Sequence, residues 1–257
     1  MVLLILAIYS LASGEVDNKV INSWMEAYKG FEPNYGQIAD FEGNPVNDIL
    51  FSTKDKGLGI FFHKKGISYV MYQYKEVEKG DMENMLTDKG LRETELSYAR
   101  VDLEIVNSNI DKNKIIYEDE LPGYTNYYLA HCPDGILYVK TYRKVRIKDV
   151  YKGIDWIFKY ENGEIHHEFE ISRDANFKDI KFKIKYADVE IENGKRIILK
   201  TPIGKIIDGE IIGYEGKNEV SVSYIKEGEY LLLDVKGWKR KEKLTIDPPL
   251  SLLWATY

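Results

Sequence analysis

Two Asn-Gly dipeptides, each lying between alternating apolar and polar segments, constrain the fold of this chain most strongly. They are Asn162-Gly163 and Asn193-Gly194. Asn-Gly favours the two-residue type I′ turn, because both central residues of that turn need a positive φ. Glu227-Gly228 marks a third turn, and stretches such as IKFKIKYADVEIE alternate with the period of a half-buried strand. The sequence therefore predicts a series of antiparallel hairpins.

The remaining sequence also favours strands. Roughly fifteen short strands separated by turn residues predict an all-β protein. The β-rich module would span residues 15–248, as an antiparallel β-sandwich or as two packed β-subdomains over 31–120 and 121–248. One segment differs: VINSWMEAYKGF has helical spacing and predicts one short N-terminal helix, with its apolar positions at Val20, Trp24, Ala27 and Tyr28.

The N-terminal run MVLLILAIYSLASGE is apolar and ends in small residues. Ala12 and Gly14 would occupy the −3 and −1 positions of a cleavage before Glu15, which predicts a secretory signal peptide over residues 1–14. A buried N-terminal strand is the alternative. The run is too short to span a bilayer and no other stretch reaches membrane length. We therefore expect a secreted or cell-surface protein without a transmembrane segment in its mature chain.

Charge and cysteine content exclude several classes of function. The chain has 36 Lys and Arg against 42 Asp and Glu, a net charge of −6. No broad positive surface is left to neutralise a phosphate backbone, so nucleic acid is not an expected partner. The basic run GWKRKEKL at 237–244 is the local exception, and such runs are typical of solvated loops. Cys132 is the single cysteine, which excludes an internal disulfide and a cysteine-based zinc site.

The segment YKGIDWIFKYENGEIHHEFEIS, residues 151–172, contains two adjacent histidines. A two-residue turn at Asn162-Gly163 would place His166 and His167 on opposite faces of the hairpin, where they cannot bind one metal ion. We interpret His167 as a half-buried ring stacked on Phe158. The same register predicts an apolar face with the cross-strand pairs Tyr160 with Ile165, Phe158 with His167 and Trp156 with Phe169.

On the other face this register places Asp155 opposite Glu170. Two facing carboxylates repel unless a cation, a shared proton or a basic neighbour intervenes. They are the ligand candidates of this sequence, as acid and base in glycoside cleavage or as calcium ligands. The interpretation that we favour is neutralisation by Arg143, Arg146 or Arg173 from an adjoining strand.

Several segments occur here in a characteristic order: FEPNYGQ, LFSTKDKGLGIFFHKKGISYVMY, TNYYL, RKVRIKDVYKGIDWIFKYENGEIHHEFEIS, LKTPIGKI and LTIDPPLSLLWATY. They resemble a domain of unknown function at the N-terminus of secreted bacterial proteins with SBBP β-propeller repeats. The most specific positions lie in a Y-x-G-I-D and an I-D-P motif and are read as structural: Tyr151, Gly153, Ile154, Asp155, Ile246, Asp247 and Pro248.

This resemblance implies that residues 249–257 begin a propeller repeat of a longer protein. The partners it implies are the C-terminal propeller repeats of that protein, with surface glycans or proteins as further candidates. It supplies no catalytic residues, no cofactor and no metal ligands.

We therefore expect a non-enzymatic N-terminal module of an exported propeller protein, with a structural or adhesive role. A carbohydrate-binding module is the first alternative, since 20 Tyr and 4 Trp could form a row of exposed rings, although strands also use aromatic residues for packing. A glycoside hydrolase is the second alternative. It would require Asp155 and Glu170 to line an open cleft, about 5 to 9.5 Å apart.

Overall fold

The computed structural model describes residues 29–40, 42–55, 58–76, 94–161, 163–247 and 249–250. The expected signal peptide at 1–14, the short N-terminal helix around Val20–Tyr28 and all but the first two residues of 249–257 lie outside these ranges. So do Asn162 of the first predicted turn and Pro248 of the I-D-P motif.

The described chain is all-β, as predicted. Two short 3-10 turns, η1 (Lys112–Lys114) and η2 (Phe177–Asp179), interrupt the strands. No helix in the described ranges is long and apolar enough to cross a membrane. The strands are β1 (Glu32–Pro33), β2 (Ile49–Asp55), β3 (Leu58–His63), β4 (Gly66–Glu76), β5 (Thr94–Ile105), β6 (Ile115–Glu120), β7 (Thr125–Leu129), β8 (Cys132–Val139), β9 (Tyr142–Tyr151), β10 (Ile154–Glu161), β11 (Glu164–Ile171), β12 (Lys181–Lys185), β13 (Asp188–Glu192), β14 (Arg196–Thr201), β15 (Gly204–Ile207), β16 (Ile212–Glu215), β17 (Asn218–Glu227), β18 (Tyr230–Lys236), β19 (Leu244–Asp247) and β20 (Pro249–Leu250).

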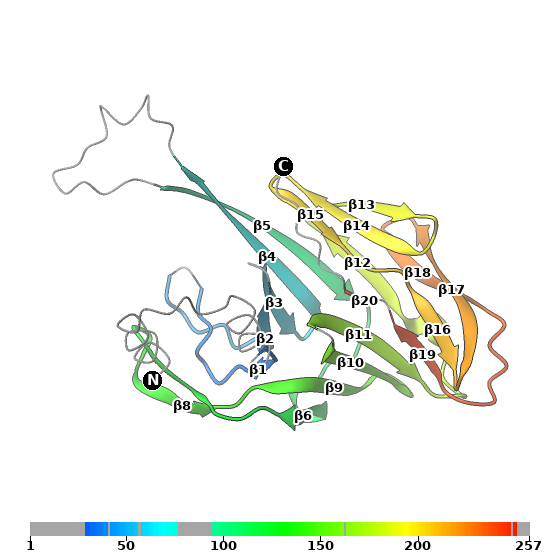
Figure 1. The fold of residues 1–257 in the computed structure, drawn as a ribbon, viewed down its shortest axis with the longest axis horizontal. Helices are drawn as coiled ribbons and strands as arrows, with labels where there is room; N and C mark the ends of the chain where they lie inside the picture. The colour runs from blue at the N-terminus through cyan, green and yellow to red at the C-terminus, as the bar shows by residue number, and fades with distance from the viewer. Residues whose placement is uncertain are drawn as a thin grey trace, which may run out of the picture.

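One large antiparallel sheet contains most of these strands (Figure 1). Its order is β1-β2-β3-β4-β5-β12-β18-β17-β16-β19-β11-β10-β9-β6, with β20 also paired to β11. The hairpin β7-β8 and the three-stranded sheet β13-β14-β15 lie off this path. Phe31, just before β1 at one end of the path, exchanges two backbone hydrogen bonds of 2.8 and 2.9 Å with Tyr142 of β9, the strand next to β6 at the other end. This bridge covers backbone groups that open sheet edges would expose.

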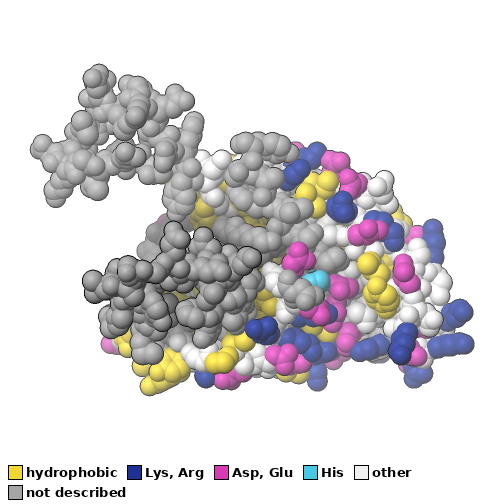
Figure 2. Space-filling model, in the orientation of Figure 1, with side chains coloured by type: hydrophobic (Ala, Val, Ile, Leu, Met, Phe, Trp, Pro, Cys, Tyr) yellow, Lys and Arg dark blue, Asp and Glu magenta, His cyan; other side chains and the backbone are white. Residues whose placement is uncertain are grey.

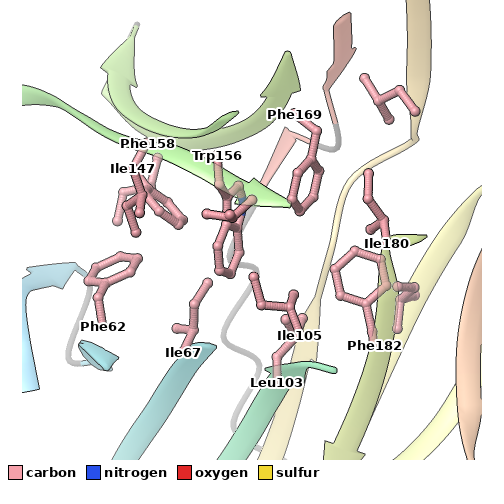
Figure 3. Close-up of a cluster of buried hydrophobic side chains, with 14 of the residues drawn as sticks. Phe62, Ile67, Leu103, Ile105, Ile147, Trp156, Phe158, Phe169, Ile180 and Phe182 are labelled. Carbon is pink, nitrogen blue, oxygen red and sulfur yellow. The ribbon is translucent and has the colours of Figure 1, made fainter. Parts of the chain in front are cut away.

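The core forms where strands from distant parts of this sheet face one another (Figure 3). Phe62 of β3 meets Phe158 of β10 with ring centroids 4.5 Å apart, and Trp156 stacks on Phe169 at 5.3 Å. All four rings are buried. The sheet also continues across the boundary between 31–120 and 121–248, because β5 pairs with β12. The sandwich and the division into subdomains stay predictions.

The turn chemistry read from the sequence is confirmed in the hairpins. In β10-β11 the pairs Trp156 with Phe169 and Phe158 with His167 have the predicted register, and Gly163 has φ 79°. Between β13 and β14, Asn193 and Gly194 have φ 53° and 68°, as a type I′ turn requires. This register fixes which side chains of 151–172 can meet.

Candidate functional site

The two carboxylates proposed as ligand candidates share one arginine. Asp155 and Glu170 lie opposite each other on β10 and β11. Arg146 of the adjoining strand β9 donates from Nη1 to Asp155 Oδ2 at 3.0 Å and to Glu170 Oε2 at 2.9 Å. Glu170 Oε1 accepts from Lys243 Nζ at 2.7 Å, and Arg146 Nε donates to Glu118 at 3.4 Å. We call these five residues the Arg146 network; it confirms neutralisation from a neighbouring strand.

The electrostatics of the network disfavour acid-base catalysis. Burial raises the pKa of Glu170, but hydrogen bonds from Arg146 and Lys243 lower it more, so that this pKa lies below its usual value. Burial lowers the pKa of Arg146, but Glu170 and Asp155 raise it by more than burial lowers it, so the net shift is upward. A general acid in glycoside cleavage needs a raised carboxyl pKa. Glu170 is held in its ionised form instead.

The Y-x-G-I-D motif forms the turn between β9 and β10. Tyr151 donates its hydroxyl to Val106 O at 2.7 Å, and Asp155 Oδ1 accepts from Asp149 N at 2.9 Å. Gly153 has φ 73°, and Ile154 is fully buried. These contacts are all internal to the protein, which is what a structural motif requires.

Ile246 and Asp247 of the I-D-P motif lie on β19, which pairs with β11 along the edge opposite to β10. Ile246 on β19 is fully buried and pairs with Phe169 of β11. The carboxylate of Asp247 lies 3.7 Å from Nδ1 of His166, also on β11. The two motifs therefore flank β11, with β10 on one edge and β19 on the other.

His166 and His167 point to opposite faces of β11, as predicted. His167 is not half-buried, however, because only 2% of it is exposed. Its ring stacks on Phe158 with centroids 6.3 Å apart, Nδ1 accepts from Trp156 Nε1 at 3.3 Å, and Nε2 lies 3.8 Å from Asp208 Oδ2. Among the described residues, no group of three His, Cys, Asp or Glu side chains is placed to hold a metal ion.

Asp208 was missed by the sequence reasoning. It follows β15 and is almost fully buried, and its Oδ2 lies 3.4 Å from the hydroxyl of Tyr224 on β17. Burial raises the pKa of Asp208, whereas His167 and Tyr224 oppose that shift. A polar row, Trp156-His167-Asp208-Tyr224, thus crosses the aromatic core. In the sequence Asp208 stands before Gly209 and looks like an ordinary turn residue, so no local signal marked it.

The hairpin β7-β8 presents a strip of exposed apolar side chains, which we call the tyrosine strip: Tyr124, Tyr128, Leu137 and Tyr138. Tyr124 and Tyr138 pack edge to face with centroids 4.9 Å apart. The Tyr128 ring lies across Gly135, where a Cβ would come 2.7 Å from the ring and 3.2 Å from Leu137. Tyr128 and Tyr138 are 66% and 63% exposed. Figure 2 shows hydrophobic side chains gathered at the lower left, the end where Figure 1 draws β8.

The other face of this hairpin is anchored by Glu32 of β1. Its carboxylate accepts hydrogen bonds from Thr125 at 3.2 Å, from Thr141 at 3.3 Å and from the Tyr127 hydroxyl. Burial and then Glu32 raise the pKa of Tyr127. Tyr127 and Tyr128 are adjacent on a strand and so point to opposite faces. Two adjacent tyrosines in the strand segment TNYYL therefore indicate that, when one ring is anchored on the inner face, the other ring lies on the outer face.

Comparison with known families gives one match: a family described as "Domain of unknown function (DUF7948)" covers residues 31–249. No curated protein matches the chain, and no solved structure does. The resemblance to a domain of unknown function is confirmed by this match, whereas the association with SBBP-repeat proteins stays a prediction.

Proposed function

The chain belongs to this family of unknown function, and from that premise we propose that it is a non-catalytic adhesive module of an exported protein. In this proposal the protein is secreted or lies at the cell surface, and the module precedes C-terminal propeller repeats. Its contact surface is the tyrosine strip.

The exposure of the strip is the observation that carries this proposal. Four neighbouring apolar side chains stay in contact with solvent although a buried core is available to the chain. Exposed apolar groups that cluster, rather than lie scattered, mark interaction surfaces. Tyr combines a large apolar ring with a polar hydroxyl and loses little conformational entropy on binding, which suits it to recognition.

The anchoring of the hairpin supports the same role. Glu32 and the contact of His131 Nε2 with Gly36 O at 3.0 Å hold the inner face of β7-β8. The exposed rings are therefore positioned before a ligand arrives, which lowers the entropy cost of binding. The Arg146 network supports a non-catalytic role, since each of its carboxylates is already engaged by a cation.

A carbohydrate-binding module is the second candidate, favoured by the composition of the strip's surroundings. Sugar rings present flat faces of C–H groups that stack on aromatic rings, with hydroxyls that need polar partners. Asn126 lies on the exposed side of β7 and accepts the N–H of Tyr138 at 2.8 Å through Oδ1. Its amide nitrogen is left to donate to a sugar hydroxyl.

Binding measurements with the purified chain test both candidates. We expect adhesion to isolated bacterial surface material that falls at least about tenfold in a Tyr128→Ala, Tyr138→Ala variant, a loss of about 1.4 kcal/mol. Tyr186→Ala is the matched control, since Tyr186 is 69% exposed and has φ 64°, close to the 60° of Tyr138. Equal adhesion of both variants would contradict the role of the strip. A glycan array probed with the same proteins tests the sugar candidate, and uniform silence there would remove it.

A further inference from the structure

The connection between β18 and β19, residues 237–243, gathers four basic side chains on an acidic protein. Lys239, Arg240, Lys241 and Lys243 are all exposed, whereas the whole chain has a net charge of −6. Figure 2 shows Lys and Arg side chains at the lower right, where Figure 1 draws this orange-red connection. We call it the basic loop.

A buried carboxylate fixes the backbone of the basic loop. Glu215, at the end of β16, is 6% exposed. Its oxygens accept backbone N–H groups of Lys239 at 3.1 Å, Lys241 at 2.6 Å and Glu242 at 3.3 Å. Burial raises the pKa of Glu215, but these three hydrogen bonds lower it more, with a net downward shift. An ionised, buried group thus defines the shape of an otherwise solvated segment.

Arg240 ties the middle of the loop to its neighbours. Its guanidinium lies 4.4 Å from the centre of the Trp238 ring and donates from Nη1 to Arg173 O at 2.6 Å and Ala175 O at 3.1 Å. Trp238 in turn packs against Phe177 with centroids 6.5 Å apart. Arg240 is therefore a structural cation.

Lys239 and Lys241, on either side of Arg240, are exposed, and among the described residues their side chains do not tie the loop to neighbouring segments. Neither makes an ion pair with an acidic side chain in the described part of the chain. Glu242, the acidic residue of the loop, directs its carboxylate over Gly216, where an added Cβ would come 2.5 Å from Oε2. Lys243 forms an ion pair with Glu170, with its Nζ 2.7 Å from Glu170 Oε1. The loop thus presents two ammonium groups on a fixed backbone.

From this arrangement we propose that the basic loop is a second binding site, which takes carboxylate or sulfate groups of an acidic polysaccharide. Lysine ammonium groups act as point charges and accept anions of varied geometry. Nucleic acid carries one charge per about 1.7 Å of duplex axis and needs a broad basic surface, which a chain of net charge −6 lacks. A polysaccharide with one anionic group every one or two sugars suits a site with two exposed lysines and no broad basic surface around them.

Binding of the full chain to polygalacturonate, dextran sulfate, neutral dextran and duplex DNA tests this proposal. We expect retention on one or both acidic polysaccharides, weakening as salt rises, and none on neutral dextran. The two acidic probes distinguish carboxylate from sulfate. Lys239→Ser with Lys241→Ser should weaken binding at least about tenfold at 0.1 M salt and flatten its salt dependence. Binding to DNA as tight as to the acidic polysaccharides would overturn the ligand class.

Two further variants separate a specific site from general charge. Lys148→Ser with Lys226→Ser removes the same charge from exposed lysines outside the loop and should leave binding within about twofold of the wild type. Glu215→Gln makes the chain more positive but releases the loop, so we expect weaker binding despite the gain in charge. Equal losses in the two lysine double variants would overturn the site, and binding by Glu215→Gln as tight as the wild type would overturn the role of the fixed loop.

Discussion

Trp156 donates its indole N–H to Nδ1 of His167 at 3.3 Å, inside the buried face of the β10-β11 hairpin. Because Nδ1 accepts this bond, the neutral imidazole carries its proton on Nε2, which faces Asp208 at 3.8 Å. The contact thus couples the aromatic core to the polar row that continues to Tyr224. A buried polar group that loses its partner is costly, so this contact holds the ring of His167 in one orientation.

Trp156→Phe should lower the free energy of unfolding by about 3 kcal/mol, because it leaves a cavity and an unpaired imidazole nitrogen. Urea unfolding followed by circular dichroism measures the loss. In a His167→Leu background the nitrogen is absent, and the same substitution should cost at least about 1 kcal/mol less. Equal costs in the two backgrounds would show that the hydrogen bond contributes nothing beyond packing.

Asp208 should make the protein less stable as pH rises. Burial raises its pKa above the usual 3.8, so its favourable contribution is complete below that pH and is lost as pH rises through the folded-state pKa. Asp208→Asn removes the titration. The difference in unfolding free energy between wild type and variant, measured from pH 3 to pH 8, should therefore shift against the wild type. A difference independent of pH would contradict this assignment.

His166, which lies beside Asp247, should change the stability of the protein in a higher pH range than Asp208 does. The nearby carboxylate of Asp247, 3.7 Å away, raises the pKa of His166 above 6.5, although burial opposes the shift. The stabilisation is complete below pH 6.5 and is lost as pH rises through the folded-state pKa. His166→Gln should cost about 0.5 to 1 kcal/mol near pH 5.5 and nothing above pH 9. Asp247→Asn is the matched variant and should give the same profile; a loss that persists at high pH would indicate packing instead.

Arg146→Met should destabilise the fold by about 3 kcal/mol, because two partly buried carboxylates lose their cation. Adding Asp155→Asn and Glu170→Gln should recover most of that loss. Lys200→Met serves as the control, since its pair with Glu190 is half exposed on both sides and solvent screening leaves such a pair little effect on stability. Chemical denaturation of the four proteins gives the comparison. Failure of the triple variant to recover stability would show that Arg146 acts through packing of its stem.

Local chemistry predicted the hairpins well. Gly163, Asn193 and Gly194 need positive φ, and a two-residue turn then sets the register of every pair that follows. The opposite directions of His166 and His167 come from that register alone. The position of Arg146 beside Asp155 and Glu170 was predicted only as one of three arginines, because the sequence does not say which strand pairs next to β10.

Contacts between distant segments could not be read in this way. Asp208 meets His167 because β13-β15 packs against the core, and the Phe31-Tyr142 bridge joins residues far apart in sequence. The tyrosine strip depends on which face of β7 Glu32 anchors. Such contacts depend on which strands become neighbours in the fold. An alternating pattern predicts which face of a strand is buried but not which strand packs against it.

Gly153 of the Y-x-G-I-D motif combines a positive φ with close neighbours, whereas Gly228 has a positive φ alone, so the two glycines separate backbone strain from crowding. Its φ is 73°, and an added Cβ would lie 3.2 Å from Ala175 Cβ and 3.4 Å from Ser172 Cβ. Gly228 has φ 59° and open space around the same position. Gly228→Ala should therefore cost about 1 kcal/mol from backbone strain alone, whereas Gly153→Ala should cost roughly 2 to 3 kcal/mol because the β9-β10 turn must also move from residues 172–175. Thermal and urea unfolding of both variants test the difference, and equal losses would mean that the motif needs glycine for its conformation rather than for close packing.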